Sequence, residues 1–217
     1  MSEPGRARMT PVVYVHGLWM PGDESFALRH RLAQDFGLAL HSFRYSTAFA
    51  SLDSTLERLA GHVASLEAPE LHFVGHSLGG LIIYRFLEQT GVLPPGRVVF
   101  LGTPCTASRT AEQAARFAPV AHLMGPVVAQ ELLRPSERSW TQPRELGIIA
   151  GTQPVGVGQF LARFEEENDG TVAVSETRMP GATDHLVLPV SHLGMLLSPR
   201  VAQETGGFLT RGRFSLH

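Results

Sequence analysis

The sequence predicts an α/β fold with about six mainly parallel strands, flanking helices and a small helical cap. Short apolar runs alternate with amphipathic segments along most of the chain, and this alternation lapses between Thr103 and Pro143. Strands that alternate with helices imply a parallel sheet covered on both faces. The 217 residues, 43% of them hydrophobic and 18% charged, fit one domain with a substantial core.

Six short segments have the apolar pattern of strands that are buried on both faces. The first is Pro11–His16, whose four inner residues are Val, Val, Tyr and Val. The others are predicted at 38–44, 71–75, 97–101, 146–150 and 185–190.

Four segments between or after these runs are predicted to be helices, at 23–36, 51–66, 78–90 and 198–209. The first follows a cap at Asp23 or Ser25, and its apolar residues recur at near-helical spacing. In the second, Ser54 and Glu57 have the spacing of a capping box.

Two helical stretches, 107–117 and 120–133, replace a single crossover where the alternation lapses. We expect them to form a cap inserted at about 104–143, within a single domain that spans residues 1–217. Such a cap would cover a site on the sheet, although its apolar residues are also compatible with ordinary packing of helices.

The composition excludes several classes of function. All 18 basic residues are Arg, so chemistry that depends on Lys, such as a Schiff base, is ruled out. A formal net charge of −2 offers no general attraction for nucleic acid. The single cysteine, Cys105, cannot form an intrachain disulfide, and we expect a small buried residue there. We also expect a cytoplasmic protein, because Met1–Met9 has no apolar run like that of a signal peptide and no segment is long and apolar enough to span a membrane.

The segment Gly75-His76-Ser77-Leu78-Gly79 matches the pattern G-x-S-x-G. It directly follows a predicted buried strand and opens a predicted helix, which is the context that a nucleophilic serine needs at a sharp turn. The N-terminus of that helix points free N–H groups toward developing negative charge. We therefore predict that Ser77 is a nucleophile.

These motifs resemble those of the α/β-hydrolase family, and most closely its small bacterial lipases and esterases. The resemblance includes Val15-His-Gly-Leu18, Gly75-His-Ser-Leu-Gly-Gly80, Leu101-Gly-Thr-Pro104, Asn168-Asp-Gly-Thr-Val172 and Ser191-His-Leu-Gly194. It covers nearly the whole chain, in the family's order. It implies the α/β-hydrolase fold, a Ser-acid-His triad and an oxyanion hole.

The triad order of this fold narrows the choice of acid and base. Only two of the five Asp residues, Asp169 and Asp184, follow Ser77. Asp184 lies at the start of a predicted strand, which is the wrong end for a partner of His192 just beyond that strand. Asp169 lies on a glycine turn, 23 residues before His192. We therefore predict that His192 is the general base and that Asp169 orients it, although an Asx turn would produce the same Asn-Asp-Gly pattern.

The resemblance also assigns the oxyanion hole to the backbone N–H groups of Leu18 and Leu78. We expect Trp19 and Met20, beside that loop, and Leu123 and Met124, in the predicted cap, to line an acyl pocket. Plain packing is the alternative for all four.

The motifs together predict a serine hydrolase that cleaves small-molecule acyl esters and needs no cofactor or metal. Calcium-dependent relatives carry an Asp two residues after the catalytic histidine, whereas this chain has Gly194. A thioesterase or acyltransferase with the same triad and a catalytically silent binding protein are the alternatives. The sequence predicts no nucleic-acid partner, leaves transient lipid contact open, and does not indicate an oligomeric state.

Overall fold

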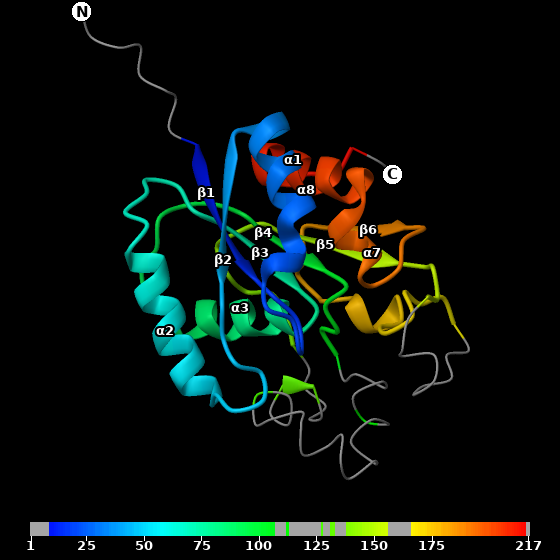
Figure 1. The fold of residues 1–217 in the computed structure, drawn as a ribbon, viewed down its shortest axis with the longest axis horizontal. Helices are drawn as coiled ribbons and strands as arrows, with labels where there is room; N and C mark the ends of the chain where they lie inside the picture. Colours follow the sequence, from blue (N-terminus) through cyan, green and yellow to red (C-terminus); the bar gives the residue numbers. More distant parts are fainter. Residues whose placement is uncertain are drawn as a thin grey trace, which may run out of the picture.

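The computed structural model describes residues 9–106, 112, 127, 131–132, 138–155 and 166–215. Its centre is one sheet of six strands in which all neighbouring strands are parallel (Figure 1). The strands are β1 (Thr10–Val15), β2 (Leu38–Phe43), β3 (His72–His76), β4 (Val98–Leu101), β5 (Leu146–Gly151) and β6 (Asp184–Leu188). The six predicted strands are confirmed, and only their ends differ by a residue or two.

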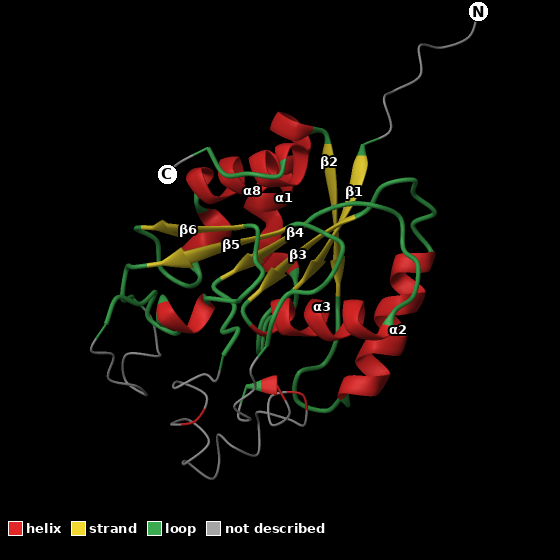
Figure 2. Cartoon of the chain, turned by 180° about the vertical axis from the view of Figure 1, so that it is seen from behind, coloured by secondary structure: helices red, strands yellow, loops and turns green. Residues whose placement is uncertain are grey.

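Helices cover both faces of this sheet, which confirms the predicted fold class. Side chains alternate along each strand, so that Val13 and Val15 of β1 face one hydrophobic cluster while Val12 and Tyr14 face the other. The first cluster packs against α2 and α3, and the second against α1, α7 and α8. Figure 2 shows these two helical layers on opposite sides of the sheet. The helices are α1 (Phe26–Phe36), α2 (Leu52–Ala64), α3 (Leu78–Gln89), α7 (Gly194–Leu197) and α8 (Pro199–Arg211), with short 3₁₀ turns η1 (Asp23–Ser25) and η2 (Ser175–Thr177).

The local signal at the start of α2 differs from the prediction. Ser51 is the N-cap, and its side chain accepts a hydrogen bond from the backbone N–H of Ser54. Ser54 therefore lies in the first turn and does not form a capping box with Glu57. Serine is the cap, as its preference for this position predicts. Ser51 and Ser54 are three residues apart, however, so the pattern allowed either one to be the cap.

The strand order β2-β1-β3-β4-β5-β6 places a change of direction between β1 and β3. The chain first moves from β1 outward to β2 and then returns to β3 on the other side of β1. Connections from β1 and β3 therefore leave on opposite faces, and open α/β sheets bind their ligands at the carboxyl ends of two such strands. This is where Leu18 and Ser77 follow their strands.

The predicted helices at 107–117 and 120–133 lie almost entirely outside the described residues. The cap at about 104–143 therefore stays a prediction. Among the residues that are described there, Val127, Glu131 and Leu132 are buried. Within the described ranges, no helix combines the length and apolarity needed to cross a membrane.

Candidate active site

Ser77 lies at the turn between β3 and α3 in a strained backbone conformation. Its φ of 55° and ψ of −125° fall in a region that residues with a Cβ rarely adopt. Two hydrogen bonds hold this turn: the N–H of Ser77 donates to the carbonyl of Leu101 at 2.9 Å, and the N–H of Gly80 donates to the carbonyl of Ser77 at 3.1 Å. Strain of this kind at a strand-to-helix turn is typical of a nucleophile that is held away from its own helix.

The glycines of the G-x-S-x-G motif are explained by close backbone approach. A Cβ at Gly75 would lie 2.4 Å from the Cα of Gly80, and a Cβ at Gly79 would lie 2.0 Å from the carbonyl oxygen of Val15. Both distances are far below van der Waals contact, so neither position accepts a side chain without moving the backbone. The motif thus packs α3 directly against the end of β1.

Asp169 and His192, which the sequence analysis paired, are in direct contact. The Nδ1–H of His192 donates to Oδ2 of Asp169 at 2.6 Å, and both side chains are buried. The second oxygen of Asp169 accepts from the backbone N–H groups of Thr171 at 2.9 Å and Val172 at 2.7 Å. These bonds fix the orientation of the carboxylate. With its proton on Nδ1, the imidazole has Nε2 free to accept a proton.

This pair lies over the end of β4, next to the turn that carries Ser77. A Cβ at Gly102, directly after β4, would lie 3.0 Å from both Asp169 Oδ2 and His192 Nδ1. The ring of His76, the residue before Ser77, lies 4.7 Å from the ring of His192, centroid to centroid. The fold therefore brings Ser77, Asp169 and His192 to one end of the sheet.

Asp184 lies elsewhere, at the start of β6, and its Oδ2 accepts a hydrogen bond from the backbone N–H of Phe214. His185 contacts Thr177, with 2.8 Å between Nε2 and Oγ1. Both residues thus join β6 to neighbouring segments of the chain.

The loop after β1 passes directly over Ser77. A Cβ at Gly17 would lie 3.1 Å from the Cβ of Ser77. His16 orders this loop: its Nδ1–H donates to the carbonyl of Gly17 at 2.8 Å, and its ring stacks on Tyr45 at 4.4 Å. Burial lowers the pKa of His16, so the ring is neutral at neutral pH.

The predicted oxyanion donors are Leu18 and Leu78, which follow β1 and Ser77 in the chain. Leu18 follows Gly17 in the same loop, and Leu78 is the first residue of α3. Backbone N–H groups in the first turn of a helix have no partner within that helix. Their use as an oxyanion hole stays a prediction.

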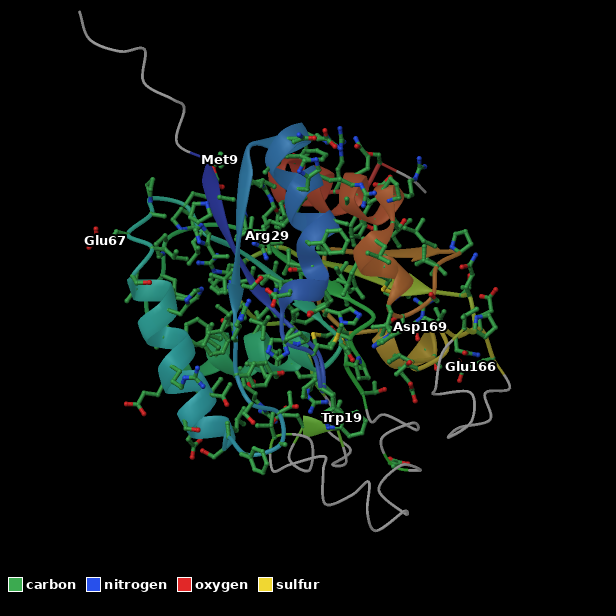
Figure 3. All side chains as sticks on the ribbon, in the orientation of Figure 1. Met9, Trp19, Arg29, Glu67, Glu166 and Asp169 are labelled. Carbon is green, nitrogen blue, oxygen red and sulfur yellow. The ribbon has the colours of Figure 1, made fainter. Side chains whose placement is uncertain are left out.

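The pocket residues fall into two groups. Trp19 has 57% of its surface exposed, and its backbone N–H donates to Thr47 Oγ1 at 3.2 Å. Figure 3 shows Trp19 at the end of β1 opposite Met9, toward the side on which Asp169 lies. Met20 packs on the hydrophobic cluster of α1 and α8, and its Sδ would lie 3.2 Å from a Cβ at Gly17. The pocket role of Trp19 and Met20 stays a prediction. Leu123 and Met124 lie outside the described residues.

Cys105 does not compete with Ser77 as a nucleophile. It is buried, and this burial raises the pKa of its thiol to about 12. A thiol with that pKa is almost wholly protonated at neutral pH, and the thiolate is the nucleophilic form. The sequence interpretation of Cys105 as a small buried residue is confirmed.

No cluster of three or more His, Cys, Asp or Glu side chains in the described ranges is arranged to hold a metal ion. Gly194, where calcium-dependent relatives carry an Asp, begins α7 and its N–H donates to Ser191 Oγ. The expectation that the reaction needs no metal stays a prediction.

Sequence reasoning missed three residues of this site. His76 contacts His192, Gly102 leaves space for the Asp-His pair, and Tyr45 holds His16 through a hydrogen bond from its hydroxyl to the His16 carbonyl at 3.0 Å. His76 and Gly102 stood within recognised motifs, but nothing in the spacing indicated their partners. Tyr45 lies beyond β2 and had no local signal.

Comparisons with known proteins agree with this fold. Residues 12–204 match the model of the alpha/beta hydrolase family. No curated protein sequence matches the chain significantly.

Several solved structures share the fold at low sequence identity. The ydeN gene product from B. subtilis has a TM-score of 0.64 and 15% identity, with 93% of this chain and 100% of that chain covered. The RedJ thioesterase from the prodiginine biosynthetic pathway in Streptomyces coelicolor has a TM-score of 0.61 and 12% identity over 93% and 91%. The metagenomic carboxyl esterase MGS0156 has a TM-score of 0.60 and 18% identity over 91% and 74%. From the family match over most of its length, the chain belongs to the α/β-hydrolase family.

Proposed function

We propose that the protein is a serine hydrolase of carboxylic esters, in which Ser77, His192 and Asp169 form the catalytic triad. The observation that carries this proposal is the buried Asp169–His192 hydrogen bond, 2.6 Å long, next to the strained turn of Ser77. Asp169 does form an Asx turn, in which Oδ1 accepts from the N–H groups of Thr171 and Val172, but its Oδ2 is bound to His192, which a turn alone does not require.

The geometry supports a two-step reaction. In the first step, Ser77 Oγ attacks the acyl carbon while its proton passes to His192 Nε2; the ester C–O bond then breaks, and the leaving alcohol takes that proton. In the second step, His192 removes a proton from water, the resulting hydroxide attacks the acyl-enzyme, and Ser77 recovers its proton as the acid leaves. Asp169 keeps the proton of the neutral imidazole on Nδ1 and stabilises the imidazolium of His192.

The N–H groups of Leu18 and Leu78 would bind the oxyanion of each tetrahedral intermediate. Support comes from the position of the two residues on either side of Ser77: the Gly17 loop passes over the Ser77 side chain, and Leu78 opens α3. Donors of this kind contribute about 3 kcal/mol each to stabilisation of the transition state in other hydrolases.

The rival within the fold is a thioesterase or acyltransferase that uses the same three residues. A thioesterase among the similar solved structures favours keeping this candidate. The chemistry differs only in the leaving group or acceptor, so the triad does not discriminate between the two.

A fluorophosphonate probe, combined with a p-nitrophenyl ester series from C2 to C16 and acyl-CoA substrates of matched length, tests both candidates. We expect covalent labelling of Ser77 in the wild-type protein, no labelling of Ser77→Ala, and faster turnover of oxygen esters than of acyl-CoA. Faster turnover of acyl-CoA than of oxygen esters would instead indicate a thioesterase. A wild-type protein that neither labels nor turns over any substrate would be a silent binding protein, and the proposed function would be wrong.

A further inference from the structure

His192 is held at three of its polar atoms, and only two of them bind Asp169. The N–H of His192 donates to the carbonyl of Asp169 at 2.9 Å, and Nδ1–H donates to its carboxylate at 2.6 Å. The third atom, the carbonyl oxygen of His192, accepts a hydrogen bond from Nε2–H of His76 at 2.9 Å. His76 therefore holds the histidine loop at a point that Asp169 leaves free.

The protonation of His76 follows from this contact. A carbonyl oxygen only accepts, so the proton of the neutral ring must be on Nε2. The other nitrogen, Nδ1, is buried and has no hydrogen-bond partner among the described residues. An unpaired buried polar atom is unfavourable, and an apolar side chain of similar volume would avoid it. Packing alone therefore does not account for a histidine here.

The position of His76 in the chain shows which parts of the site this bond connects. His76 is the last residue of β3, and Ser77 is the next residue. The backbone of His76 is held in β3, and the next residue is held by the hydrogen bond from the N–H of Ser77 to the carbonyl of Leu101 in β4. A bond from His76 to the main chain of His192 thus links the base to the residue adjacent to the nucleophile.

We propose that His76 is a positioning residue, which fixes the distance between Ser77 and His192 through its Nε2–H bond to the His192 carbonyl. The inference rests on the proposed function of Ser77 and His192. His76 does not touch the reacting atoms in this scheme; it acts through the position of the histidine loop.

The surroundings of His76 keep this donor constant. Burial, which has the largest effect, and the adjacent His192 ring lower the pKa of His76 to about 3, although the hydrogen bond to the His192 carbonyl and the charge of Asp169 raise it; His16 adds a smaller lowering effect. The ring is therefore neutral across the range in which such a hydrolase works. An imidazolium that forms at His192 during the reaction meets no second positive charge from His76.

The test compares substitutions that keep or remove the N–H at this place. His76→Gln retains an amide N–H at about the distance of Nε2 from the backbone, whereas His76→Asn is polar but too short, and His76→Met is apolar with a similar length. The control is His72→Met, because His72 is also a buried histidine of β3 with one backbone hydrogen bond, accepted from Arg97 N–H, at the opposite end of the strand.

We expect kcat for p-nitrophenyl esters to fall about 10- to 100-fold in His76→Met and His76→Asn, with KM changed little, because misplacement of a catalytic group has effects of this size. His76→Gln should recover most of kcat. His72→Met should stay within about twofold of wild type, since it removes a bond of similar strength far from the site.

Proton NMR gives a readout that does not require turnover. The proton between His192 Nδ1 and Asp169 Oδ2 should resonate far downfield, as expected for a short charge-assisted bond. We expect this signal to shift or broaden in His76→Met and His76→Asn, and to be restored in His76→Gln. His72→Met should leave it unchanged.

The proposal is wrong if His76→Met and His76→Asn keep both kcat and the downfield signal. It is equally wrong if His76→Gln loses as much kcat as His76→Asn, because the N–H would then not be responsible. A loss of kcat in His72→Met as large as in the His76 variants would also contradict it. Should His76→Met fail to fold, the Gln and Asn pair decides alone. Failure of wild-type Ser77 to label with fluorophosphonate would instead overturn the proposed function, while the NMR comparison would still test the positioning.

Discussion

The two ends of the sheet use the same residue types for different purposes. At the amino ends of the strands, His72 accepts a hydrogen bond from the N–H of Arg97, and Asp184 accepts one from the N–H of Phe214. Each of these side chains joins one segment of backbone to another. At the carboxyl ends, His192 contacts both His76 and Asp169 beside a strained serine.

This difference teaches that residue type does not by itself predict a role in this fold. The carboxyl ends of parallel strands are where the connecting loops converge and where helix N-termini point. A histidine and an aspartate from distant parts of the chain meet there. At the amino ends, the same residues stabilise turns and termini.

The largest expected effect comes from the nucleophile and base at the carboxyl end. Ser77→Ala and His192→Ala should each lower kcat by about 10⁶-fold, and the double variant should lose little more, because residues that act as one unit are not additive. Steady-state kinetics with a p-nitrophenyl ester measures this. His185→Gln, which changes a histidine near the amino end of β6, is the control and should keep wild-type kcat. A Ser77→Ala variant that retains more than a few per cent of kcat would contradict the assignment.

The acids provide the second test. Asp169→Asn should reduce kcat by about 10⁴-fold, because the amide favours the wrong tautomer of His192. Asp184→Asn retains an oxygen that accepts from Phe214 N–H, so we expect near wild-type kcat and only a small loss of stability. The same kinetic assay, with circular dichroism to check folding, compares them. The reverse pattern, with Asp184→Asn inactive but folded, would reject Asp169.

A smaller effect concerns the free energy of unfolding as a function of pH. Burial, aided by Arg97 and Arg144, lowers the pKa of His72 to about 4. As the pH falls below about 6.5, His72 therefore binds a proton in the unfolded chain but stays neutral in the native state. Stability from this group is fully present above pH 6.5 and is lost as the pH falls toward 4, by about 1.4 kcal/mol per pH unit.

Urea unfolding of the wild type and His72→Gln at several pH values between 7 and 4.5 measures this dependence. The variant lacks the titrating ring, so its stability should fall less steeply with decreasing pH. Equal slopes for the two proteins would show that His72 is protonated in the native state as readily as in the unfolded chain.

The last prediction is that removal or addition of a metal ion does not change the rate of ester hydrolysis. Hydrolysis of an acyl ester should be unchanged by EDTA and by added calcium, since Gly194 occupies the position of the calcium ligand in calcium-dependent relatives. Initial rates before and after dialysis against EDTA check this. A clear loss that calcium restores would mean that other residues bind the metal.

Much of the fold could be predicted from the sequence because its signals are local. The apolar runs of β3 and β5 show the continuous burial that parallel strands require, and Gly75 and Gly79 mark the close approach of α3 to β1. The choice of Asp169 over Asp184 followed from the triad order of the family and the direction of the strands. The cap of α2 was predicted less well: the helix starts where expected, but Ser51 is the cap and Ser54 does not form a capping box with Glu57.

The sequence by itself therefore determined the order of strands and helices and the sharp turn at Ser77, since these depend on neighbouring residues. The triad order that the family resemblance implies then narrowed the acid and base to Asp169 and His192. Only the tertiary structure decided the other contacts of the site. The contact of His76 with the His192 carbonyl, the space left by Gly102 and the support of His16 by Tyr45 join segments that are far apart in the chain. Such contacts arise from the packing of six strands in one sheet, and no periodicity along the chain encodes them.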